Sequence, residues 1–130
     1  MWTAMFSRRS DVSVVRQAAG REFQSHGFVD DDDLILMLSE LVTNAVVHGT
    51  APRSIAIEVT AAEVTVKVSD ASPVLPQVRQ PEPLALGGNG MRIIDQLASA
   101  WGVDLTSGGK TVWIRHDRTD LTPGLASDLP

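Results

Sequence analysis

The chain has 130 residues, of which 43% are hydrophobic, and this is enough for one domain with one core. A net charge of -5 argues against a nucleic-acid-binding protein, because such proteins usually carry a basic stripe. The sequence has no cysteine, no apolar span long enough for a bilayer and no basic segment leading into a signal sequence. We therefore expect a cytoplasmic protein without disulfides, thiolate metal sites or membrane contact.

The chain is predicted to begin with an edge strand and an amphipathic helix. The strand is expected at residues 2–7. Residues 11–26 carry an apolar stripe at helical spacing, with Ser10 or Asp11 as the cap and Gly27 at the end.

The second predicted helix, residues 34–48, is apolar enough to be buried but contains polar residues at a spacing of four. The four aspartates at 30–33 suit the positive end of its dipole, and a metal cluster is the less favoured interpretation. Glu40, Asn44 and His48 share one helix face. Because polar groups are costly to bury without partners, Glu40 and Asn44 indicate either a bound ligand or an internal polar cluster. His48 is expected to be a helix-end residue.

A hairpin, a long loop, a helix and a second hairpin are predicted in the rest of the chain. Alternating apolar residues indicate the strands, and four prolines break the pattern in the loop, which is long enough to be a functional lid. The expected bounds are 54–59 and 64–70 for the first hairpin, 71–87 for the loop, 91–101 for the helix, and 102–107 and 110–116 for the last hairpin.

This order of elements predicts an α/β fold, a two-layer sandwich of a mixed, mostly antiparallel sheet with helices on one face. We expect one domain over residues 1–117 and a flexible tail over 118–130. The other sheet face would lack helix cover. Val112 and Ile114 are expected to lie there and to need burial against a second copy of the chain or another partner.

Two further places can bind a ligand. Asp70 has the parity of the buried valines in its strand, so it is expected to point to the buried side. There it could accept a hydrogen bond from a ligand amine, or it could cap the following turn. The glycine-rich segment 87–91 precedes a helix, which suits a phosphate, and a hinge is the other interpretation. The segment is neither a dinucleotide fingerprint nor a P-loop.

The order of these features resembles the GHKL ATPases, which include gyrase, the heat-shock-90 chaperones and the histidine kinases. Residues 39–49 resemble their N box, Asp70 their adenine-binding aspartate, and residues 88–94 their second glycine box. Residues 109–113 resemble the late strand whose threonine closes the adenine site. The small size and the Trp-Gly pair after the last helix resemble the anti-sigma factor serine/threonine kinases of the short actinobacterial type.

The resemblance covers residues 10–116 and implies ATP and Mg²⁺ as cofactors. Asn44 would hold the Mg²⁺ that bridges the phosphates, and Glu40 would be the general base toward a target hydroxyl. Asp70 would bind the adenine amine. The other implied ATP-binding residues are Ser72 and Thr111 near the base, and Gly88, Asn89, Gly90 and Met91 near the phosphates.

The chain departs from the family after Asp70. The family often has Asp-x-Gly-x-Gly, whereas this chain has Ala71, Ser72 and Pro73 and lacks both glycines. The leading hypothesis is an anti-sigma regulatory factor that sequesters a sigma factor and phosphorylates an anti-anti-sigma antagonist protein on Ser or Thr. The alternative is a partner-switching module with weak or no ATP binding and no kinase activity. The ATPase half of a larger machine ranks last, since no transducer domain is evident.

Overall fold

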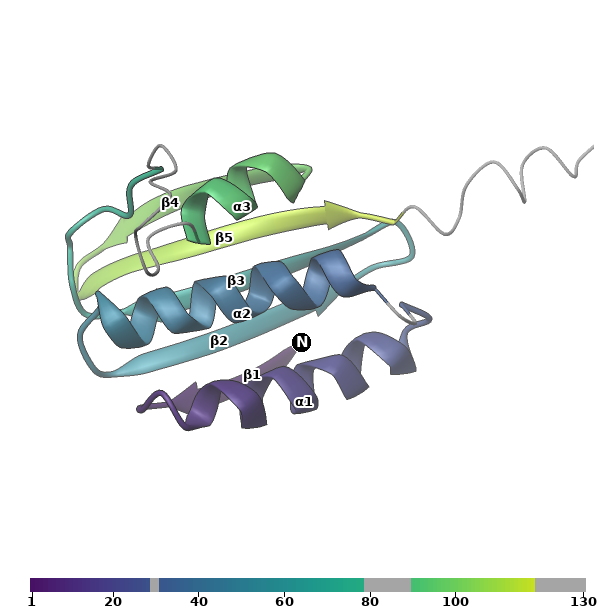
Figure 1. The fold of residues 1–130 in the computed structure, drawn as a ribbon, viewed down its shortest axis with the longest axis horizontal. Helices are drawn as coiled ribbons and strands as arrows, with labels where there is room; N and C mark the ends of the chain where they lie inside the picture. Colours follow the sequence, from purple (N-terminus) through teal and green to yellow (C-terminus); the bar gives the residue numbers. More distant parts are fainter. Residues whose placement is uncertain (29–30, 79–89, 119–130) are drawn as a thin grey trace, which may run out of the picture.

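The computed structural model describes residues 1–28, 31–78 and 90–118 (Figure 1). The elements in chain order are β1 (Trp2–Phe6), α1 (Asp11–Ser25), α2 (Asp32–Val47), β2 (Arg53–Val59), β3 (Glu63–Asp70), α3 (Gly90–Leu97), β4 (Ala100–Thr106) and β5 (Gly109–Asp117).

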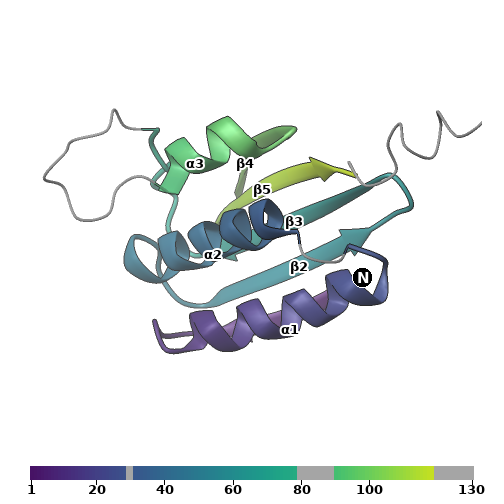
Figure 2. The same cartoon turned by 45° about the vertical axis from the view of Figure 1, so that its right-hand side comes forward.

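The five strands form one sheet in the order β1-β2-β3-β5-β4. Every described strand pair is antiparallel. The three helices lie together on one face of the sheet, as both ribbon views show (Figures 1 and 2). The expected two-layer α/β sandwich is therefore confirmed, with an antiparallel rather than a mixed sheet. The predicted edge strand is also confirmed, since β1 pairs only with β2 among the described strands.

The core lies between the sheet and the helices. On the covered sheet face, Val66 pairs with Ile114 and Val68 with Val112. The expectation that Val112 and Ile114 lie on the uncovered face is wrong, because both are buried in the core, with 7% and 0% exposure. The alternate residues of β5, including Trp113 and Arg115, have the opposite parity and therefore lie on the face opposite the three described helices.

Residues close in sequence determine the C-terminal end of α1 and the N-terminal end of α2. Gly27 has φ 90°, and the N–H groups of Gly27 and Phe28 return to the carbonyls of Gln24 and Phe23, so α1 ends as predicted. The Asp31 carboxylate accepts a hydrogen bond from the Leu34 N–H at 3.0 Å and caps α2. Asp30 lies outside the described residues, and in the described part of the chain no group of three or more His, Cys, Asp or Glu could hold a metal ion.

Helix α3 is shorter than predicted. It ends at Leu97, and β4 begins at Ala100, so residues 98–101 are not helical. Trp101 pairs with Ile114 in the sheet, and its indole N–H donates to the Asp95 carboxylate at 2.9 Å. Pairing with β5 thus overrides the helical pattern of the segment.

Some expectations lie wholly or partly outside the described residues. The predicted loop is described only as far as Val78, and the predicted tail only at Arg118. Among the described residues, no helix is long and apolar enough to cross a membrane.

Candidate functional site

A cavity of about 220 Å³ lies between α2, α3 and the paired strands β3 and β5. Asp70 and Lys110 line what we call its inner end, and Asn44 and Gly90 line its outer end. Most of the wall between them is apolar. The apolar residues contributed by these helices and strands are Leu41, Ala45, Val68, Met91 and Val112.

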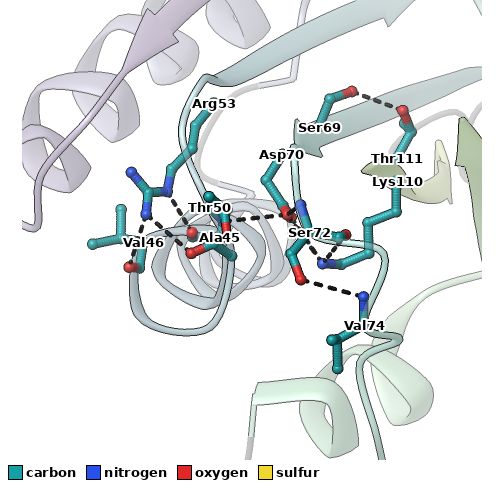
Figure 3. A network of polar contacts seen from close by, with 11 residues as sticks. Ala45, Val46, Thr50, Arg53, Ser69, Asp70, Ser72, Val74, Lys110 and Thr111 are labelled. Atoms are coloured by element: carbon teal, nitrogen blue, oxygen red, sulfur yellow. Dashed lines mark hydrogen bonds and ion pairs between the residues drawn. The ribbon is translucent and has the colours of Figure 1, made fainter. Parts of the chain in front are cut away.

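The Asp70 carboxylate at the inner end has several protein partners. Its side chain is 3% exposed, and each of its oxygens lies 3.1 Å from the Lys110 ammonium. Oδ1 also accepts hydrogen bonds from the N–H of Ser72 at 2.7 Å and from the N–H of Thr50 at 3.4 Å (Figure 3). The bond to Ser72, two residues on, is an Asx turn. Asp70 therefore caps the turn with one oxygen and still faces the cavity.

Gly49 permits this position of Asp70. A Cβ on Gly49 would lie 2.6 Å from the Asp70 carboxyl carbon and 2.6 Å from the Ala45 carbonyl oxygen. Helix α2 ends before it, with exposed His48 as the C-cap, so the interpretation of His48 as a helix-end residue is confirmed. Gly49 does not adopt the positive φ that often terminates a helix. Its small size serves the approach of β3 instead.

Lys110 was not predicted as a site residue. It lies directly opposite Asp70 in the β3–β5 pair, and its side chain is 6% exposed. Its ammonium also donates to the Ser72 carbonyl at 3.0 Å. The signal was present in the sequence, because Lys110 has the same parity as Val112 and Ile114. A lysine at a buried parity position needs a counter-charge.

Thr111 does not reach this cavity. It pairs with Ser69, and the two hydroxyl oxygens lie 2.7 Å apart, away from the carboxylate (Figure 3). Neighbouring strand residues point to opposite faces, so Thr111 lies on the face without helices. The structure thus puts Lys110, one residue earlier, where the resemblance implied Thr111.

Ser72 is buried beside Asp70, and its backbone groups and hydroxyl oxygen already have protein partners. Its N–H bonds Asp70, its carbonyl bonds Lys110, and its hydroxyl accepts from the Val74 N–H at 3.2 Å. Ser72 therefore shapes the loop at the cavity wall.

The outer end brings Glu40 and Asn44 of α2 to the start of α3. A Cβ on Gly90 would lie 2.7 Å from a Glu40 carboxylate oxygen and 3.4 Å from the Asn44 amide. Neither side chain makes a hydrogen bond or ion pair with any of the described residues. The interpretation of the two as an internal polar cluster is therefore not supported. Partly buried polar groups without partners beside a helix N-terminus suit an anionic ligand and its metal ion.

Two predicted residues of this end, Gly90 and Met91, begin α3 and line the cavity. Gly88 and Asn89 lie outside the described residues.

Arg53 fixes the end of α2 that carries these groups. Its guanidinium donates to the carbonyls of Ala45 at 2.6 Å and Gly49 at 3.1 Å (Figure 3). It also donates to the carbonyl of Ser7 at 3.0 Å. A cation near the helix C-terminus satisfies carbonyls that have no partner within the helix. Sequence reasoning missed this residue, because no local pattern links it to α2.

Residues 7–116 match the family model of the histidine kinase-like ATPase domain, which is most of the chain. The chain belongs to this family. A search of curated proteins gives no significant match. The fold is the α/β sandwich expected of a histidine kinase-like ATPase, and family membership implies an ATP-binding domain.

The residues present fit such a nucleotide with its metal ion. Asp70 supplies a carboxylate at the inner end, apolar walls lie between, and Asn44 supplies an amide oxygen near the start of α3. The amide oxygen is a hard ligand of the kind that Mg²⁺ accepts. Both groups line the same cavity.

Partial burial makes the charged form of Glu40 less favourable than it is in water. Burial raises the pKa of its carboxyl group above the ordinary value. The folded state therefore holds the proton more tightly than the unfolded state. Stability is therefore greatest below the unfolded-state pKa of this group and is lost as the pH rises through the folded-state pKa.

Glu40→Gln should consequently unfold at a higher urea concentration than the wild type at neutral pH. The gain should stay under about 1 kcal/mol, because the carboxylate keeps part of its solvent exposure. The difference should vanish near about pH 3, where the carboxyl group is protonated in both states. Urea titrations at the two pH values measure it, and equal stability at neutral pH would contradict the desolvation.

Proposed function

We propose that this protein binds ATP with Mg²⁺ in the cavity, with adenine at the inner end and the phosphates at the outer end. The observation that carries this proposal is the pair of polar side chains, Glu40 and Asn44, which have no partner among the described residues and lie beside the first residue of α3. Asn44 would hold the Mg²⁺, which neutralises charge on the phosphates when bound. The free N–H groups at the start of α3 would face phosphate oxygens.

We further propose that the protein is an anti-sigma regulatory factor with serine/threonine kinase activity. Glu40 would accept the proton of a Ser or Thr hydroxyl on an antagonist protein. That oxygen would bond to the γ-phosphorus as the bond between this phosphorus and the β–γ bridging oxygen breaks and ADP leaves. The raised pKa of Glu40 supports the role, because a more basic carboxylate is a better proton acceptor.

Exposed apolar residues beside the cavity support a protein partner. Val74 and Leu75, both in the cavity wall, are 70% and 53% exposed, and nearby Val78 is 45% exposed. Apolar residues that gather on a surface mark interaction sites. In this proposal the partners are a sigma factor and its antagonist, with the transferred hydroxyl presented at the outer end. The chain would exchange one for the other to regulate transcription.

Asn44→Ala should abolish the stabilisation that Mg-ATP gives the wild type. At a ligand concentration about 100 times its Kd, that stabilisation is about 2.7 kcal/mol. Thermal unfolding with and without Mg-ATP measures it. Thr43→Ala is the matched control, because Thr43 lies on α2 outside the cavity wall and should keep the shift. A full shift in Asn44→Ala would contradict the placement of the metal ion.

Glu40→Gln should separate binding from transfer. It should keep the Mg-ATP shift and lose phosphate transfer to the antagonist by about 10²- to 10⁴-fold, the usual contribution of a general base. Transfer of labelled phosphate from ATP measures this. Unchanged transfer in Glu40→Gln would remove Glu40 from the mechanism.

A partner-switching module without nucleotide is the second candidate, and one observation favours it. The Asp70 carboxylate already has Lys110, Ser72 and Thr50 as partners. If these partners satisfy Asp70 fully, no hydrogen bond is left for adenine, and the exchange of protein partners would proceed without ATP. Absence of any Mg-ATP shift in the wild type, together with binding of the sigma factor, would establish this candidate.

A further inference from the structure

The inner end of the cavity holds a buried cation as well as a carboxylate. Lysine is almost never fully buried unless it is paired. Lys110 is paired with Asp70, and both residues line the cavity together with the apolar side chains of Val68 and Val112. Any ligand that reaches Asp70 therefore also meets the ammonium group.

The ammonium group has three N–H donors for two protein groups. Lysine carries three such donors. The structure gives Lys110 two groups to bond, the Asp70 carboxylate and the Ser72 carbonyl. Because both carboxylate oxygens lie at the same distance, 3.1 Å, one shared N–H can serve them.

The carboxylate has one oxygen to spare. Oδ1 of Asp70 accepts from Ser72, Thr50 and Lys110, whereas Oδ2 has only Lys110 among the described residues. Oδ2 can therefore accept one more hydrogen bond. The inner end thus offers one donor and one acceptor side by side.

We propose that Lys110 is a specificity-determining residue that donates a hydrogen bond to N1 of adenine while Asp70 Oδ2 accepts from the neighbouring 6-amino group. The inference rests on the proposed binding of ATP. Guanine presents the reverse order at these positions, an N–H at N1 and a carbonyl at position 6, so Lys110 would face a donor and Oδ2 an acceptor. Its 2-amino group adds a further donor. Oδ1, the only other carboxylate oxygen, already has three donors, so that amino group would be buried without an acceptor.

The test compares ATP with 1-deaza-ATP, in which a C–H group replaces N1. Calorimetric titration of the wild type with Mg²⁺ present should give a Kd for 1-deaza-ATP roughly 10- to 100-fold weaker than for ATP, as expected for a lost bond to a charged donor. The control ligand 7-deaza-ATP keeps N1 and the amine and should bind within about threefold of ATP, since N7 is absent from the proposed contacts.

The same two nucleotides are then compared in Lys110→Met, because methionine keeps much of the volume of lysine and removes the donor. This variant should bind ATP and 1-deaza-ATP equally, both near the wild-type affinity for 1-deaza-ATP. Lys67→Met is the matched control. Lys67 lies on β3 with its side chain 45% exposed and paired to Glu58, and this variant should discriminate like the wild type.

The outcomes separate the two proposals. Equal wild-type affinity for ATP and 1-deaza-ATP would overturn the role of Lys110 and leave ATP binding intact. A Lys110→Met variant that still prefers ATP to 1-deaza-ATP as strongly as the wild type would also overturn the role of Lys110. If the wild type binds no ATP, the proposed function fails and this inference fails with it. The wild-type comparison uses no variant, so it stands even if Lys110→Met does not fold.

Discussion

Asp70→Ala is expected to lower the free energy of unfolding by about 3–5 kcal/mol, among the largest effects of any single substitution in this protein. Removal of the carboxylate leaves the Lys110 ammonium buried with no counter-charge, since its side chain is only 6% exposed. It also leaves the N–H groups of Ser72 and Thr50 without their acceptor. Urea unfolding at neutral pH measures the loss.

The double variant Asp70→Leu with Lys110→Met should recover most of this loss. With both charges replaced by apolar groups of similar volume, the desolvation penalty disappears. About 1–3 kcal/mol of the loss should remain, because the backbone donors around position 70 still lack a partner. Equal losses in the single and the double variant would show that the backbone bonds, and not the ion pair, account for the effect. The exposed Lys67–Glu58 pair is the control, and Lys67→Met should cost under about 1 kcal/mol.

Gly109→Ala is expected to lower the free energy of unfolding by about 2–4 kcal/mol. Gly109 begins β5 with φ 153°, where a side chain is rarely tolerated. A Cβ there would overlap the Asp70 carbonyl oxygen and lie 2.6 Å from the Cα of Ala71. Both contacts are backbone atoms, so relief requires the end of β3 to move. This movement would displace Asp70 from the cavity.

Gly108→Ala is the matched control for that substitution. It changes the preceding residue of the same turn, but a Cβ on Gly108 would meet no atom within 4 Å. Its stability should stay within about 0.5 kcal/mol of the wild type. The same urea midpoint for the two variants would contradict the close approach of β5 to Asp70.

The fold was predictable from the sequence where the periodicity was strong. Alternating isoleucines and valines predicted β2 and β3 nearly to the residue, and apolar spacing after a run of aspartates predicted α2. Prediction failed where a distant strand decides the structure. Residues 98–101 look helical alone, yet Trp101 pairs with Ile114 of β5. The wrong face assigned to Val112 and Ile114 has the same origin, because only the register with β3 determines which face the helices cover.

The candidate site was predictable in outline. The spacing on α2 predicted Glu40 and Asn44 as site residues, and strand parity predicted that Asp70 points inward. The structure places Asn44 and Asp70 in the cavity wall and Glu40 beside Gly90. Lys110 was missed, because its role depends on a contact that spans 40 positions of the chain. Arg53 was missed, because no local pattern links it to the end of α2 that it contacts. Thr111 was favoured by the resemblance, whereas the same parity rule that placed Asp70 puts its hydroxyl against Ser69.

The alternation between Lys110 and Thr111 has a consequence for how such a domain can change. Shifting β5 by one position, through a deletion in the turn before it, would bring the Thr111 hydroxyl to Asp70 in place of the ammonium. The same shift would turn Trp113 and Arg115 into the layer now filled by Val112 and Ile114. A change in turn length therefore cannot replace Lys110 by Thr111 without disrupting the core. A neutral group opposite Asp70 can arise only by substitution at position 110 itself.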